Sequence, residues 1–156
     1  MREEQLTEEY LSRFPTKLHS VLEIEKFRNR FLSKVLNVYP QTVVYRGIHR
    51  KDAVCTDDFL SNVDEAELYG RSAPRPSLEA NAVSVNEDPQ QIITALHIPN
   101  PSRPMLGVAK GVMRSDFGPA DFSLFDGIPV THHNWYLFQD KVQDAVETFA
   151  AIDFPE

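Results

Sequence analysis

The sequence predicts an α+β domain in which N-terminal helices pack on a mostly antiparallel sheet and a further helix lies near the C-terminus. Three observations support this prediction. Apolar residues recur at helical spacing over residues 1–40, short β-branched and aromatic segments dominate afterwards, and helical spacing returns over 140–149. The 156 residues, 42% of them hydrophobic, are enough for one domain, with a helical segment at 1–40 and a sheet-containing body at 41–156.

The first forty residues show two helical patterns. Leu6, Tyr10 and Phe14 recur at intervals of four, and Pro15 ends this pattern because proline cannot continue a helix. A second pattern follows Thr16, a residue type that caps helices. Its apolar residues recur at threes and fours and predict one face of a helix over 16–38: Leu18, Val21, Ile24, Phe27, Phe31, Val35 and Val38.

The predicted helix over 16–38 has more large apolar residues than one face of a sheet usually covers. Leu22, Leu32 and Leu36 lie beside the main apolar face and widen it. Part of this surface is therefore available to another molecule. We expect it to contact a second copy of the chain, in a two-fold homodimer, or another protein.

Strand patterns begin after Pro40. The segment 42–48, TVVYRGI, is rich in β-branched and aromatic residues and is too short for a typical helix, so it predicts the first strand. Residues 64–69 allow a single helical turn. The segment 70–77 holds one glycine and two prolines, which interrupt regular hydrogen bonding, so we expect an exposed loop there.

The second half of the chain alternates strands with helices. Residues 82–85, AVSV, predict a short strand. Asp88 is a typical N-cap and Pro89 a typical first helical residue, so a helix is expected from there to about His97. The remaining predicted elements are a central strand over 105–114, a strand over 130–138 and a helix over 140–149.

The net charge limits the classes of partner. The chain has 16 Lys and Arg against 23 Asp and Glu, a net charge of −7. Duplex DNA and anionic membranes bind clustered basic residues, so nucleic acid is disfavoured as a partner. One basic cluster alternates with phenylalanines and is typical of the solvent face of an amphipathic helix: Lys26, Arg28, Arg30 and Lys34.

Several classes of protein are disfavoured by what the sequence lacks. It has no run of about eighteen apolar residues and no N-terminal signal-peptide pattern, so we expect a soluble, cytoplasmic protein without a membrane partner. The single cysteine, Cys55, excludes an internal disulfide and is too few for a thiolate zinc site; we expect a small, half-buried side chain. No metal site is predicted, and no cofactor can be assigned.

The segment 131–136, THHNWY, is the first candidate site. In a strand, His132, Asn134 and Tyr136 share one face, whereas His133 and Trp135 share the other. The polar face could line a pocket in which His132 exchanges a proton, assisted by Tyr136, while Asn134 binds a ligand. The alternative is that His132 is an ordinary surface or structural histidine. We expect His133 to be a core residue that bonds a backbone carbonyl.

Arg46, in the predicted first strand, is the second candidate. An arginine on a central strand destabilises the fold unless its guanidinium group bonds a carboxylate or a phosphate. Two interpretations are open. Arg46 either forms part of an anion site, next to the open backbone of Gly47, or pairs with a carboxylate of this chain: Asp57, Asp58 or Glu65.

The string Val44-Tyr45-Arg46-Gly47 resembles the first-strand motif of the arginine-serine-glutamate class of ADP-ribosyltransferases. The resemblance implies that Arg46 holds the phosphates of NAD and that Ser84, in the predicted strand at 82–85, corresponds to the serine of that class and positions the substrate. It extends to these five residues. The Glu-x-Glu or Gln-x-Glu triplet that the class carries near its end does not occur after Ser84.

Three hypotheses about function follow. The first is a binding or assembly module with an anion or nucleotide site, whose N-terminal helices present Phe27 and Phe31 to a partner. The second is a small transferase or hydrolase acting on NAD or another nucleotide. The third is a nucleic-acid-associated regulator, which the charge places last. The missing glutamate favours binding over turnover, so we leave open whether the protein is an enzyme.

Overall fold

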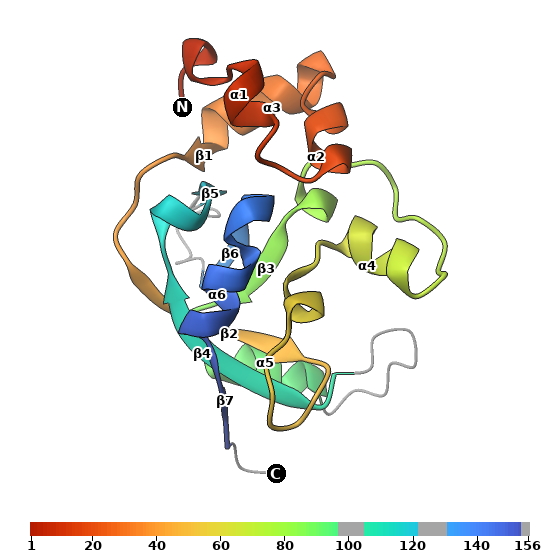
Figure 1. The fold of residues 1–156 in the computed structure, drawn as a ribbon, viewed down its shortest axis with the longest axis vertical. Coiled ribbons are helices and arrows are strands. Elements are labelled where there is room, and N and C mark those ends of the chain that lie inside the picture. Colours follow the sequence, from red (N-terminus) through yellow and green to blue (C-terminus); the bar gives the residue numbers. More distant parts are fainter. Residues whose placement is uncertain (97–104, 122–130, 154–156) are drawn as a thin grey trace.

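The computed structural model describes residues 1–96, 105–121 and 131–153 and confirms the α+β fold (Figure 1). Over these ranges one seven-stranded sheet has the order β1-β5-β6-β3-β2-β4-β7, and all neighbouring strands are antiparallel. The strands are β1 (Val35–Leu36), β2 (Thr42–Ile48), β3 (Val83–Asn86), β4 (Gly107–Met113), β5 (Ala120–Asp121), β6 (His132–Trp135) and β7 (Ala150–Ile152).

The two longest strands of the sheet, β2 and β4, pair with each other. The strand predicted over 42–48 is confirmed, and it pairs along its whole length, from Thr42 opposite Met113 to Ile48 opposite Gly107. The central strand predicted over 105–114 is also confirmed, two residues shorter at its start and one at its end. On its other side β4 pairs with β7, an edge strand that the sequence pattern did not predict.

The sheet separates between β2 and β3. Their register joins one pair of residues, Tyr45 and Asn86. Continued for two more residues, this register would place Gly47 opposite Ser84, but the ladder stops before them. The separation leaves space beside the ends of both strands.

The N-terminal segment differs from the prediction. Instead of a continuous helix over 16–38, the chain forms α2 (Thr16–Val21), α3 (Glu25–Lys34) and then β1. Val35 has extended backbone angles because it pairs with Asp121 of β5, and this tertiary pairing outweighs the helical spacing of the apolar residues. The shorter elements before Pro15 are η1 (Glu3–Gln5) and α1 (Glu8–Leu11).

The N-terminal helices lie together at one end of the molecule and enclose a core of their own (Figure 1). Phe31 is fully buried there, against Leu18 and Tyr136 among others, so the expectation that Phe31 is presented to a partner is wrong. The large apolar side chains of 16–38 that stay exposed are Ile24, Leu36 and Val38. A homodimer through this segment stays a prediction, now limited to these three residues.

The other helices lie around the sheet. The helix expected from Pro89 is α5 (Pro89–Leu96), and His97 lies outside the described residues. The terminal helix is shorter than predicted, as α6 (Val142–Thr148) after a turn of 3-10 helix, η5 (Gln139–Lys141). The remaining helical elements are η2 (Thr56–Phe59), α4 (Asn62–Leu68), η3 (Glu79–Asn81) and η4 (Ser115–Phe117).

A second core holds the sheet against α6. Trp135 and Phe149 are buried in it, together with Val44 of β2. Its polar groups are satisfied by main-chain oxygens: Trp135 Nε1 and Tyr39 Oη both donate to the carbonyl oxygen of Gly118, at 3.3 and 2.6 Å. Among the residues that the structure describes, no helix has the length and apolar character needed to cross a bilayer.

Candidate functional site

A pocket of about 530 Å³ opens where β2 and β3 separate. Its volume lies within the range of small-molecule sites. Four of the five side chains singled out in the sequence line it: Arg46, Ser84, His132 and Asn134. They come from three different strands, β2, β3 and β6, so the fold brings together residues that are up to 88 positions apart.

The side chain of Arg46 links β2 to β3 where these two strands separate. Its guanidinium donates hydrogen bonds to the carbonyl oxygens of Ser84 at 2.6 Å and Leu60 at 3.1 Å, and also to that of Asp58. The bond to Ser84 replaces part of the missing β2 and β3 ladder. The expected partner was a carboxylate or an anion, but these three N–H donors go to main-chain oxygens. Arg46 therefore holds the pocket wall and adds positive charge to it.

Ser84 and His132 are in direct contact inside the pocket. Ser84 lies opposite Asn134 in the β3 and β6 register, and His132 lies two pairs further along, opposite Asn86. The side chains of Ser84 and His132 meet diagonally across the two strands, with 2.5 Å between Oγ and Nε2. Burial lowers the pKa of His132, and the neighbouring His133 lowers it further, so the neutral imidazole is favoured. Neutral Nε2 can accept the Ser84 proton.

The expected alternation along THHNWY is confirmed for the strand itself. His132 and Asn134 face the pocket, whereas His133 and Trp135 are buried on the other side. The partner of His133 differs from the expected backbone carbonyl: its Nε2 lies 2.8 Å from a carboxylate oxygen of Glu87.

Tyr136 is not brought into the pocket. Strand β6 ends at Trp135, and the ring of Tyr136 turns into the N-terminal core, where it packs edge-on against Phe31 at 5.2 Å between centroids. Its side chain is 1% exposed, and burial raises the pKa of its hydroxyl. The assignment of proton movement to Tyr136 therefore has no geometric support.

Arg75 is a pocket residue that the sequence pattern did not single out. It lies in the predicted loop at 70–77 and lines the pocket with an exposed side chain. It makes no hydrogen bond or ion pair with any residue in the described ranges. Both carboxylates that line the pocket are already paired: Glu65 with Arg71 at 3.0 Å, and Glu79 with Arg30 at 2.5 Å. The charge left open to a ligand is positive.

His49 is the second pocket residue that was missed. It follows β2, and its Nδ1 lies 2.8 Å from Oδ1 of Asp58, a carboxylate that is fully buried. Asp58 also accepts the backbone N–H groups of His49 and Cys55, each at 2.8 Å. No sequence motif marks this pair, because Asp58 lies in η2, nine positions after His49, and their contact depends on how the chain between them folds. Cys55 is half-buried, as predicted.

One group of side chains in the described ranges has the spacing of cation ligands. Atoms of His49, Asp57 and Asp58 lie within 4.8 Å of one another. Asp58 accepts three N–H groups, and Asp57 pairs with Arg50 at 3.1 Å. These contacts explain why the group is close together, so we assign it a structural role.

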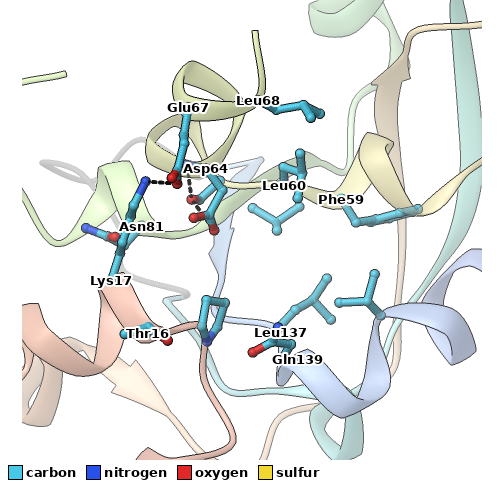
Figure 2. A pocket seen from close by; sticks show the side chains of 14 residues that line it. Thr16, Lys17, Phe59, Leu60, Asp64, Glu67, Leu68, Asn81, Leu137 and Gln139 are labelled. Atoms are coloured by element: carbon cyan, nitrogen blue, oxygen red, sulfur yellow. Dashed lines mark hydrogen bonds and ion pairs between the residues drawn. The ribbon is translucent and has the colours of Figure 1, made fainter. Parts of the chain in front are cut away.

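A second pocket, of about 480 Å³, lies between α2, α4 and the segment before α6 (Figure 2). Phe59, Leu60 and Leu137 give it an apolar side. Its charged groups have partners: Lys17 pairs with Glu67, and the carboxylate of Asp64 accepts a hydrogen bond from Ser61, the residue that caps α4. This pocket offers a ligand fewer open polar groups than the first one.

Comparisons with known proteins add no relative. No family model, no curated protein and no solved structure matches the chain. The geometry of the pocket is therefore the basis for inferring its function.

Proposed function

We propose that the protein is a binding module for an anionic ligand of the nucleotide type, held in the pocket between β2 and β3. The observation that carries this proposal is the set of groups that line the pocket: Arg46, Ser84, His132, Asn134 and Arg75, which has no ion-pair partner in the described ranges. Guanidinium groups bind phosphate through charge-assisted hydrogen bonds. Hydroxyl, amide and imidazole groups suit the sugar and base.

The choice of a nucleotide among anions has two supports. Ile92 and Met105 give the pocket an apolar lining. This lining suits the base of a nucleotide, whereas a bare phosphate would not need it. In addition, the resemblance of the VYRG string to ADP-ribosyltransferases points to Arg46 and Ser84, and both line this pocket. ADP and NAD are therefore the first probes.

Calorimetric titration with ADP tests the proposal. Arg75→Ala removes the open cation and is expected to weaken ADP binding about tenfold, the loss of one charge-assisted contact. Lys34→Ala is the matched control, because it removes the same charge from an exposed position on α3 that does not line the pocket. Equal affinity of the two variants, or no binding of ADP and NAD to the unaltered protein, would contradict the proposal.

A second candidate function is a transferase or hydrolase acting on the same class of ligand. The contact between Ser84 Oγ and His132 Nε2 favours it, because a neutral imidazole next to a hydroxyl can activate that hydroxyl as a nucleophile. Incubation with NAD, followed by chromatography for nicotinamide and ADP-ribose, tests this function. Product formation that is lost in Ser84→Ala supports it, and unchanged NAD after prolonged incubation removes it.

A further inference from the structure

The imidazole of His49 has one nitrogen engaged and one nitrogen open. Nδ1 faces the buried carboxylate of Asp58, which is an acceptor, so the ring hydrogen is on Nδ1. Nε2 has no hydrogen-bond partner among the described residues, and the side chain lines the pocket, where it is 12% exposed. A neutral imidazole held in this way presents a lone pair at Nε2.

Asp58 fixes the orientation of this ring. It is 0% exposed and accepts N–H groups from His49 and Cys55, so its carboxylate cannot rotate without breaking several bonds. The ring of Tyr69 lies 5.5 Å from that of His49 and limits its movement on one side. A buried carboxylate that orients a histidine is the arrangement that fixes the tautomer of reactive imidazoles in proteins.

Charged groups surround the pair formed by His49 and Asp58. Arg46, three residues before His49, lines the same pocket. Of the nearby carboxylates, Asp57 is paired with Arg50 and Glu65 with Arg71. Asp58 is bonded to His49 and Cys55.

We propose that His49 is a specificity residue of this pocket: its Nε2 accepts a hydrogen bond from a hydroxyl of the bound ligand, with Asp58 as the positioning residue. Arg75 and Arg46 would attract the phosphate, and His49 would select phosphorylated ligands that have sugar hydroxyls. The inference rests on the proposed nucleotide function and narrows the ligand to the ribose type. Loss of the sugar hydroxyls removes the donor that Nε2 needs.

The matched pair of variants is His49→Asn and His49→Ala. Asparagine keeps a side-chain N–H near the position of Nδ1, so it preserves the bond to Asp58 but has no atom at the position of Nε2. Alanine loses both. We expect His49→Asn to melt close to the unaltered protein and His49→Ala to melt lower, which separates the pocket-facing role of His49 from its structural role.

Two measurements decide the proposal. In ligand-free protein labelled with ¹⁵N at histidine, NMR is expected to show the Nδ1–H tautomer for His49; the Nε2–H tautomer would overturn the inference whether or not any nucleotide binds. With ADP and 2′,3′-dideoxy-ADP as probes, the unaltered protein is expected to prefer ADP about fivefold and His49→Asn to lose this preference. Equal binding of both probes to the unaltered protein would overturn the inference while leaving the nucleotide site intact. Binding of neither would contradict the proposed function, and the tautomer would still decide the orientation of His49.

Discussion

Replacement of Asp58 by asparagine tests how the pocket wall is held. Asp58 is fully buried, and its two oxygens accept three N–H groups, from the backbone and ring of His49 and from the backbone of Cys55. Asparagine has nearly the same size but only one acceptor oxygen. If that oxygen stays with His49, the new amide N–H₂ faces the N–H of Cys55, and a donor that was bonded at 2.8 Å loses its acceptor.

The expected cost follows from the number of bonds lost. A hydrogen bond to a charged group contributes about 1.5–3 kcal/mol, and at least one is lost, so we expect the free energy of unfolding to fall by about 2–3 kcal/mol. This is a large share of a typical total of about 5–15 kcal/mol. With a urea dependence of about 2 kcal/mol per molar, the midpoint of urea unfolding should fall by about 1 M.

Asp52→Asn is the control for this experiment. Asp52 is exposed and lies six residues from Asp58, and its replacement removes the same charge from the chain. Its effect should stay within about 0.5 kcal/mol, as for most surface substitutions. If Asp58→Asn shifts the midpoint no more than Asp52→Asn, then the buried carboxylate does not hold the segment from His49 to Cys55 and does not orient His49.

Three further predictions concern stability and assembly. The pKa of His132 is lowered from its ordinary 6.5, so as the pH falls through 6.5 the unfolded chain binds this proton before the folded protein does, and the free energy of unfolding should decrease. In urea unfolding at pH 7.5 and 5.5, this decrease should be smaller in His132→Gln than in the unaltered protein. An equal decrease in both would contradict the prediction. Gly118→Ala should lower the free energy of unfolding by about 3 kcal/mol in the same assay, because a Cβ there would lie 2.2 Å from the backbone oxygen of Tyr136. Gly70→Ala, with open space around it, should lower it by about 1 kcal/mol. Similar losses in the two variants would show that the backbone around Gly118 can move to accept the Cβ. For the dimer through Ile24, Leu36 and Val38, sedimentation should give about twice the chain mass of 17.8 kDa, and a strict monomer removes this assembly.

The local sequence pattern correctly predicted those elements in which the residue types and their spacing favour the same conformation as the tertiary contacts do. Strand β2 was predicted to the residue, because β-branched residues and a central position in the sheet favour the same conformation. The helical spacing over 16–38 was misleading, because Val35 and Leu36 gain strand partners in β5 that lie far away in the sequence. Edge strand β7 has three residues, too few for a recognisable pattern.

The candidate site was predictable only as far as strand alternation reaches. Alternation placed His132 and Asn134 on one face, and it failed at Tyr136, where the strand ends. The main-chain partners of Arg46 and the pairing of His49 with Asp58 depend on how the segment 49–60 folds against β2, which no local spacing encodes. The open charge of Arg75 likewise depends on the carboxylates around it being paired elsewhere.

The most direct test of the central claim is the location of bound ADP. In ¹H–¹⁵N NMR spectra of the assigned protein, saturating ADP should shift the amide signals of Gly47, Ser84 and His132 and leave those of Lys17 and Leu68, in the second pocket, unchanged. At a hundred times the dissociation constant, the same ligand should stabilise the fold by about 2.7 kcal/mol, which corresponds to a rise in melting temperature of about 5–11 °C. Shifts confined to the second pocket, or no shifts and no rise in melting temperature, would contradict a nucleotide site between β2 and β3.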